Sequence, residues 1–258
     1  MKTTTLGFIG GGRITRIILQ ALKNKAVEFE SIIVFEPNTE TSSELQRQFP
    51  EIKVADSPDK PAGQDLVFLA VHPPVMMEAL GNIKETVTDS TVIVSLAPKI
   101  TLERMASMLS KGKHVRMIPN ATSIINKGYN PVSFSASISN DEKTSLLDLL
   151  KVLGKTFEVK ESSLEGYAIV SAMLPTYFWF QWMKMEEIAI QTGIPEADIN
   201  RIIGSTLRRS LKLFYKSNMT HEEVIDLIPV KPIGDNEEEI ERILETKLLG
   251  LYEKIRPQ

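Results

Sequence analysis

Three consecutive glycines, Gly10 to Gly12, follow an apolar run that starts at Leu6 and precede a segment with helical apolar spacing from Ile14. Without Cβ atoms, Gly10 permits a tight strand-to-helix turn, and Gly12 lets the backbone approach a pyrophosphate at the positive end of the helix. The third position of this glycine pattern is Thr15. The spacing predicts a dinucleotide-binding turn, and a glycine-rich turn that binds nothing is the alternative.

A carboxylate follows the second apolar run, 31–35, at Glu36. An acidic residue at this distance from the glycines is placed to bind an adenosine ribose. Glu36 would then disfavour the 2′-phosphate of NADP, whereas Arg13 at the helix start could offset that repulsion. NAD or NADP is therefore the expected cofactor, with NAD favoured, unless Glu36 only accepts a hydrogen bond from a loop amide.

The elements that must position these residues alternate along the first part of the chain. β-Branched runs separated by helical segments predict a doubly wound parallel sheet of the α/β class, with strands at 5–9, 31–35, 65–71, 91–96, 114–118 and 156–160. After residue 161 the pattern becomes helical, over 163–192, 196–216 and 237–253. We expect a dinucleotide-binding domain over 1–161 and an all-helical domain over 162–258.

Several predicted strands end in residues that belong at the ligand edge of such a sheet. His72 and Pro73 follow one strand, Ala97 another, and Pro119 with Asn120 a third. Ligands of open α/β sheets bind outside the carboxyl ends of the strands. Asn120 is the strongest polar candidate in this group.

Composition excludes several classes of protein. The 258 residues include no cysteine, 30 basic and 33 acidic side chains, for a net charge of −3. No long basic block favours nucleic acid, no apolar run is long enough to span a membrane, and the three histidines have no metal-ligand spacing. We expect a cytoplasmic protein without a metal.

The helical segment after residue 161 is apolar on more than one face, with Trp179, Phe180 and Trp182 among its aromatic residues. A helical domain of fewer than about 100 residues covers such a helix most easily with a second subunit. We therefore expect a homodimer formed through the C-terminal helices.

Five segments together resemble the pyrroline-5-carboxylate reductase family, and the resemblance runs nearly end to end. They are the glycine loop, Val71-His72-Pro73, Val94-Ser95-Leu96-Ala97, Met117-Ile118-Pro119-Asn120 and Ser171-Ala172-Met173-Leu174-Pro175-Thr176-Tyr177. The family has a Rossmann domain followed by a helical dimerisation domain. It reduces a cyclic imine to proline with NADPH or NADH.

The resemblance implies roles for individual positions. The pyrophosphate would be held by Gly10, Gly11, Gly12, Arg13 and Ile14, and the ribose would face Glu36 and Asn38. The cofactor would pass along Val71, His72, Pro73, Ser95, Leu96 and Ala97, with Pro119 and Asn120 near the nicotinamide. Ser171, Pro175 and Tyr177 match the substrate-side motif, which makes Ser171, Tyr177 and Asn120 the candidate catalytic residues.

The chain departs from the family on the substrate side. Ala172, Met173 and Leu174 replace the GSG of the family's SGSGPAY motif. Two large apolar side chains should make that pocket smaller and drier, and with Pro175 they would line it. Lys231 to Asn236 stand where the family has SPGGTT, and Asp235 there could pair with an iminium cation but would repel a substrate carboxylate.

Reduction of a C=N bond needs orientation over the nicotinamide and no strong catalytic acid. A β-hydroxyacid dehydrogenase would need a lysine on the first long helix after the boundary, and none occurs between Ser162 and Met183. The small-molecule substrate is therefore expected to be pyrroline-5-carboxylate or a more apolar imine. The alternatives are a catalytically silent dinucleotide-binding relative with a regulatory or assembly role, and an oxidoreductase that uses another hydride carrier such as a deazaflavin.

Overall fold

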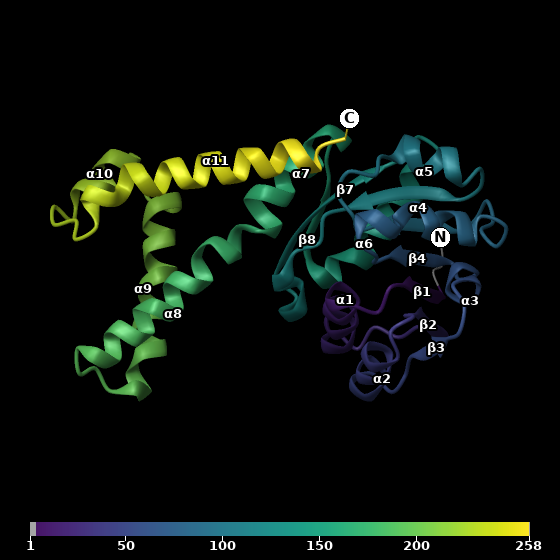
Figure 1. Ribbon diagram of the computed structural model, residues 1–258, viewed down its shortest axis with the longest axis horizontal. Helices are drawn as coiled ribbons and strands as arrows, with labels where there is room; N and C mark the ends of the chain where they lie inside the picture. Colours follow the sequence, from purple (N-terminus) through teal and green to yellow (C-terminus); the bar gives the residue numbers. More distant parts are fainter. Residues whose placement is uncertain (1–3, 258) are drawn as a thin grey trace. The chain divides into compact units, whose positions relative to one another are not determined.

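A computed structural model describes residues 4–257, and Figure 1 labels its helices and strands. The chain divides into two compact units. The first comprises the described residues through Ala172 together with the segment that begins at Leu251, and the second is Met173–Gly250. The last strand ends just before the boundary expected at residue 161, whereas the first compact unit continues to Ala172 and includes three short helical segments after that strand.

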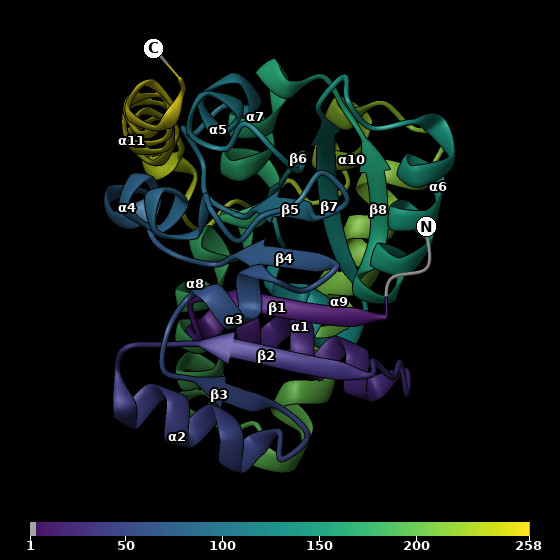
Figure 2. The same cartoon turned by 90° about the vertical axis from the view of Figure 1, so that its right-hand side faces the viewer.

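The first unit is built on one eight-stranded sheet with the order β3-β2-β1-β4-β5-β6-β7-β8. Figure 2 shows β3, β2, β1 and β4 in this order along the sheet. The strands are β1 (Thr5–Ile9), β2 (Ser31–Phe35), β3 (Lys53–Ala55), β4 (Leu66–Leu69), β5 (Val92–Ser95), β6 (Lys113–Met117), β7 (Gly128–Phe134) and β8 (Gly154–Glu158). The order reverses between β1 and β4, which is where this type of sheet binds ligands.

Helices cover both faces of the sheet and bury two apolar layers. Side chains of α1 (Arg13–Asn24), α2 (Thr39–Gln48) and α6 (Asn140–Leu150) pack on one face, including Ile18, Leu45 and Leu146. Those of α3 (Asp59–Ala62), α4 (Pro73–Ile83) and α5 (Leu102–Met108) pack on the other, including Ala62, Leu80 and Met105. This confirms the predicted doubly wound α/β fold.

Two strands are absent from the prediction, β3 and β7. β3 has three residues, too few for a periodic signal, and β7 contains Asn130 and Pro131, which are unfavourable in a strand. β7 pairs antiparallel with β6, so the described sheet is parallel except at this pair, which the predicted strands did not include. Pro131 is tolerated because its neighbours still form the ladder to β6 and β8.

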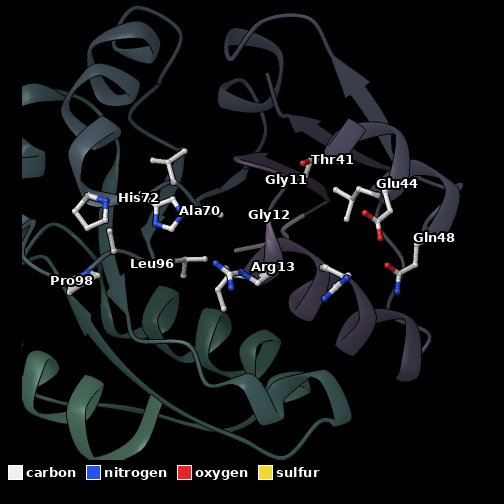
Figure 3. Close-up of a pocket in the computed structure, with 16 residues that line it drawn as sticks. Gly11, Gly12, Arg13, Thr41, Glu44, Gln48, Ala70, His72, Leu96 and Pro98 are labelled. Carbon is white, nitrogen blue, oxygen red and sulfur yellow. The ribbon is translucent and has the colours of Figure 1, made fainter. Parts of the chain in front are cut away.

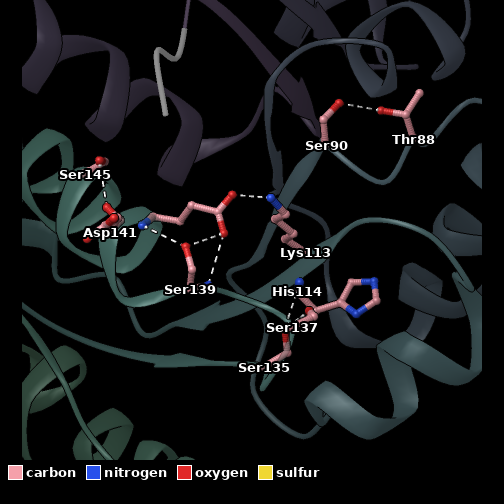
Figure 4. A network of polar contacts seen from close by, with 10 residues as sticks. Thr88, Ser90, Lys113, His114, Ser135, Ser137, Ser139, Asp141 and Ser145 are labelled. Atoms are coloured by element: carbon pink, nitrogen blue, oxygen red, sulfur yellow. Dashed lines mark hydrogen bonds and ion pairs between the residues drawn. The ribbon is translucent and has the colours of Figure 1, made fainter.

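β6 presents charged side chains to both faces of the sheet. Lys113 pairs with Glu142 of α6 on the face that buries Val115 and Met117. The Lys113 hydrogen bond, followed by those from Ser139, lowers the pKa of Glu142 to about 2. Figure 4 shows the polar contacts around Lys113 and Ser139, with His114 nearby. Since side chains alternate along a strand, Arg116 lies on the opposite face from Lys113.

The expected helix over 163–192 is interrupted. A 3₁₀ turn (Glu161–Ser163), α7 (Leu164–Tyr167) and a π-helical turn (Ala168–Ala172) precede α8 (Leu174–Gln191). Pro175 lies in the first turn of α8, where its missing N–H costs no intrahelical bond. The expectation of one continuous helix was therefore wrong at its start.

In the second unit α8 and α9 (Glu196–Lys216) lie side by side (Figure 1). α10 (His221–Asp226), which the prediction lacked, follows α9, and α11 (Glu237–Ile255) begins in this unit. No helix among the described residues is long and apolar enough to cross a membrane.

Candidate functional site

A cavity of about 640 Å³ lies at the carboxyl ends of β1, β4 and β5 in the first unit (Figure 3). Its volume is in the range of small-molecule sites. The cavity is lined by Gly11, Gly12, Arg13, Ile14, Arg16, Thr41, Glu44, Leu45, Gln48, Ala70, Val71, His72, Pro73, Leu96, Ala97 and Pro98.

The glycine loop is shaped for close approach. Gly10 has φ +101°, and a Cβ there would lie 2.5 Å from the Ala70 carbonyl oxygen, so other residues would clash. At Gly12, the N-cap of α1, no atom lies within 4 Å of the Cβ position, and the residue faces the cavity. An open backbone at a helix N-terminus suits an anionic phosphate.

Thr15 accounts for the departure from the glycine pattern. Its side chain is fully buried, and Oγ1 donates a 2.6 Å hydrogen bond to the carbonyl oxygen of Gly10. The first turn of α1 is thereby joined to the loop that precedes it. The threonine fixes the loop without entering the cavity.

Glu36 follows β2 and uses its carboxylate to hold the loops around it. Oε2 accepts a 2.8 Å hydrogen bond from the Gly11 amide, and Oε1 accepts one of 2.9 Å from the Asn38 amide. The Asn38 side chain caps α2 by accepting from the Thr41 amide at 2.8 Å. Glu36 therefore does accept hydrogen bonds from loop amides, which was the alternative to ribose binding. Its role in binding the ribose stays a prediction.

The far wall of the cavity comes from the ends of β4 and β5. Val71, His72 and Pro73 lead into α4, and Leu96, Ala97 and Pro98 follow β5. Ser95 lies beneath this wall, fully buried. Most residues expected to contact the cofactor therefore line one cavity or lie directly beneath its wall.

From the sequence we did not predict that residues of α2 line the cavity. Thr41, Glu44, Leu45 and Gln48 line the cavity, and their spacing puts them on one helix face. Arg16 of α1 lines the same part of the cavity, as do Ala70 and Pro98 beside residues that were selected. The spacing of Thr41, Glu44 and Gln48 is the signal that could have identified this face.

Asn120 lies outside the residues that line the cavity, and both ends of its side chain are engaged. Oδ1 accepts from the amide and hydroxyl of Thr122, and Nδ2 donates to the carbonyl oxygen of Ser171 at 3.1 Å and to its Oγ at 3.3 Å. The residue is 5% exposed. The fold thus brings Asn120 and Ser171 together. Pro119 is half-buried and is not among the residues that line the cavity.

The remaining candidates belong to the second unit. Met173, Leu174, Pro175 and Tyr177 stand at and after the start of α8, and Asp235 is exposed in a 3₁₀ turn (Gly234–Asn236). Burial raises the pKa of Tyr177. Their substrate roles stay predictions.

Comparison with known proteins identifies relatives over most of the chain. Residues 5–99 match a family described as NADP oxidoreductase coenzyme F420-dependent. Pyrroline-5-carboxylate reductase of Corynebacterium melassecola is 27% identical over 203 residues, 77% of this chain and 75% of the relative. That of Escherichia coli K12 is 26% identical over 245 residues, 94% and 90% of the two chains.

Solved structures share the fold. Plasmodium falciparum pyrroline carboxylate reductase with NADP bound has a TM-score of 0.82 at 18% identity, over 99% of this chain and 98% of the other. The Streptococcus pyogenes enzyme has a TM-score of 0.74 at 23% identity, over 97% and 96%. The glycine loop and the sheet order agree with these similarities, and the chain is similar to pyrroline-5-carboxylate reductases over most of its length.

Proposed function

We propose that this protein is an NAD(P)H-dependent reductase of a cyclic imine, either pyrroline-5-carboxylate or a more apolar relative. The observation that supports it most is the cavity at the carboxyl edge of the sheet. Gly12, which has open space at its Cβ position, and the cationic Arg13 line this cavity together with the residues that follow β4 and β5. The cavity volume of about 640 Å³ is in the range of small-molecule sites, and the cavity lies at the point where the strand order reverses. The 26% identity to the Escherichia coli reductase over 94% of the chain supports the reaction class.

The loop residues fit a dinucleotide. Gly12 leaves room for the pyrophosphate, Arg13 supplies a positive charge beside it, and Glu36 holds the Gly11 amide in place. A bound reduced nicotinamide would supply the hydride. The chain would bind the adenosine half near Glu36 and orient the other half along Val71 and Leu96.

We favour NAD over NADP. The negative charge of Glu36 stands at the end of β2, where it would repel a 2′-phosphate. Arg13 lines the cavity from the start of α1 and would act mainly on the pyrophosphate.

The substrate side is proposed to be more apolar than in the rest of the family. Met173 and Leu174 replace glycine-rich backbone, and the carboxylate of Asp235 would repel an anionic substrate. A protonated imine without a carboxylate fits these changes better than pyrroline-5-carboxylate does.

The proposed assembly is a homodimer through the C-terminal helices. Ile199 is the one buried residue among those described in the second unit, while Phe180 and Met183 of α8 are 65% and 64% exposed. A large exposed apolar surface of this kind is typical of a subunit interface. The zero cysteine count supports the cytoplasm as its location.

Two observations favour other functions. The altered Ser171 to Tyr177 segment, with the Asn120 amide fully engaged, supports a silent dinucleotide-binding relative. The family matched by residues 5–99 is described as coenzyme F420-dependent, which supports a deazaflavin as the hydride carrier.

Deuterium transfer separates these candidates. The purified protein is incubated with NADH deuterated at nicotinamide C4 and with a panel of cyclic imines with and without a carboxylate. Deuterium at the former imine carbon would establish the reductase and its substrate. Binding of NADH without transfer to any imine would leave the silent relative, and transfer only from a reduced deazaflavin would replace the cofactor.

A further inference from the structure

A buried arginine stands one strand away from the cavity wall. Arg116 of β6 is 1% exposed and donates to two carboxylates from the segment that follows β8. Its Nη1 lies 2.9 Å from Glu161 Oε1, and its Nη2 pairs with Glu165 Oε1. Arg116 Nε has no hydrogen-bond partner among the described residues.

The same two carboxylate oxygens also hold the backbone that follows β5. Glu165 Oε1 accepts from the Lys99 amide at 3.1 Å, and Glu161 Oε1 accepts from the Leu102 amide at 2.7 Å. The loop between these amides continues directly from Pro98, which lines the cavity. One guanidinium therefore fixes two acceptors, and each acceptor fixes one end of the loop.

Lys99 shows why the loop needs such anchoring. Its φ of +76° lies in the left-handed region, which residues other than glycine rarely adopt. The surrounding structure must hold such a residue in place. Glu165, 1% exposed, accepts a hydrogen bond from the Lys99 amide and so restrains this residue.

We infer that Arg116 is a positioning residue for the dinucleotide: through Glu161 and Glu165 it fixes the Leu96–Lys99 wall against which the nicotinamide half binds. The inference rests on the proposed function for the identity of the ligand. The geometry separates the two halves of that ligand. The adenosine half would lie on the β1 and β2 side, near Gly11 and Glu36, whereas the wall held by Arg116 follows β5.

Comparing two ligands in one variant tests the inference. Arg116→Met should raise the Kd of NADH about tenfold, because the wall moves, and leave the Kd of ADP unchanged, because the glycine loop does not. Lys113→Met is the matched control, since it removes an ion pair from the same strand on the other face and should change neither Kd. An unchanged NADH Kd in folded Arg116→Met would overturn the inference.

Loss of Arg116 leaves two carboxylates without their cation, so that variant can fail to fold. Glu161 is 30% exposed in its side chain and allows a milder pair of variants. Glu161→Ala should weaken NADH binding without affecting ADP, whereas Glu161→Gln, which keeps an acceptor oxygen for the Leu102 amide, should restore it. Equal NADH Kd values in Glu161→Ala and the parent protein would show that the Leu96–Lys99 wall does not depend on the contacts of Arg116, Glu161 and Glu165.

A readout without ligand distinguishes this inference from the proposed function. Amide hydrogen exchange at Lys99 and Leu102 should accelerate in Glu161→Ala and stay slow in Lys113→Met. If the parent protein binds neither NADH nor ADP, the proposed function fails, while exchange still reports whether the network holds the loop. Unchanged exchange at both amides would reject the network's role.

Discussion

The two units of this chain bury their apolar residues to very different extents. The first unit has two apolar layers on a sheet and a cavity formed entirely by its own residues. In the second unit α8 has no buried residue and α9 has only Ile199, among the residues described. The first unit therefore has a core and a cavity of its own, whereas the second is expected to depend on another copy of the chain.

The same contrast exists in the family motifs. The first unit keeps the glycine loop and the residues at the strand ends, and the second contains Met173 and Leu174 in place of glycine-rich backbone. Cofactor binding is thus expected to follow the family, while substrate choice is expected to differ. Changes in one unit should leave the property assigned to the other intact.

The largest expected effect is that of Gly12→Asp in the first unit. A carboxylate beside the pyrophosphate should weaken NADH binding by about 100-fold or more, as measured by calorimetry. The protein should remain folded, because no atom lies within 4 Å of the new Cβ and aspartate is a favourable N-cap.

Gly81→Asp is the matched control for that variant. Gly81 of α4 also has open space at its Cβ position, and it is not among the residues that line the cavity. It should bind NADH as the parent does. Tight NADH binding by Gly12→Asp would contradict the assignment of the glycine loop.

In the second unit, Phe180→Asp should disrupt the proposed dimer. Placing a charge on an apolar interface should weaken association by about 2 kcal/mol or more, so light scattering should show a shift from twice the monomer mass towards the monomer. Lys184→Ala on the same helix should leave the mass unchanged. A monomeric parent protein at micromolar concentration would refute the dimer.

Glu36→Gln tests the choice between NADH and NADPH in the first unit. Glutamine keeps an oxygen that can accept from the Gly11 amide but removes the charge that disfavours the 2′-phosphate. The ratio of the NADPH Kd to the NADH Kd should fall about tenfold. An unchanged ratio would show that Glu36 only supports the loop.

The smallest expected effect is the dependence of the first unit's stability on His114. Burial lowers the pKa of His114 despite a hydrogen bond with the Lys111 backbone, and its Nε2 has no partner among the described residues. The unfolded chain binds the proton first, so stability is complete above pH ~6.5 and falls as the pH drops below it. Urea unfolding should show a loss of up to about 1 kcal/mol between pH 7.5 and 5.5.

His114→Leu removes this titrating group. The variant should lose less stability than the parent over the same pH interval. An equal loss in both proteins would mean that other groups account for it.

Local signals in the sequence were sufficient for most of the first unit. The glycine loop and the five parallel strands β1, β2, β4, β5 and β6 each depend on a short run of residues, and all five were predicted close to their observed bounds. β7 was not, because its pairing with β6 and β8 compensates for Pro131 only once the chain has folded.

Side-chain partnerships were harder to predict than strand positions. Asn120 was placed at the strand edge from its neighbours, but its bonds to Ser171 join residues 51 positions apart. Arg116 and its two glutamates are separated by 45 and 49 positions. In the sequence, only the presence of an arginine within a predicted buried strand indicated that acidic partners were needed. Distant partners of this kind require the three-dimensional structure.

Whether this protein is an imine reductase can be measured by titrating the purified protein with NADH, following nicotinamide fluorescence, and then adding pyrroline-5-carboxylate or a carboxylate-free pyrroline. We expect saturable binding followed by loss of nicotinamide absorbance, and the loss should be faster with the carboxylate-free imine. Absence of NADH binding, in a protein shown to be folded, would contradict this expectation.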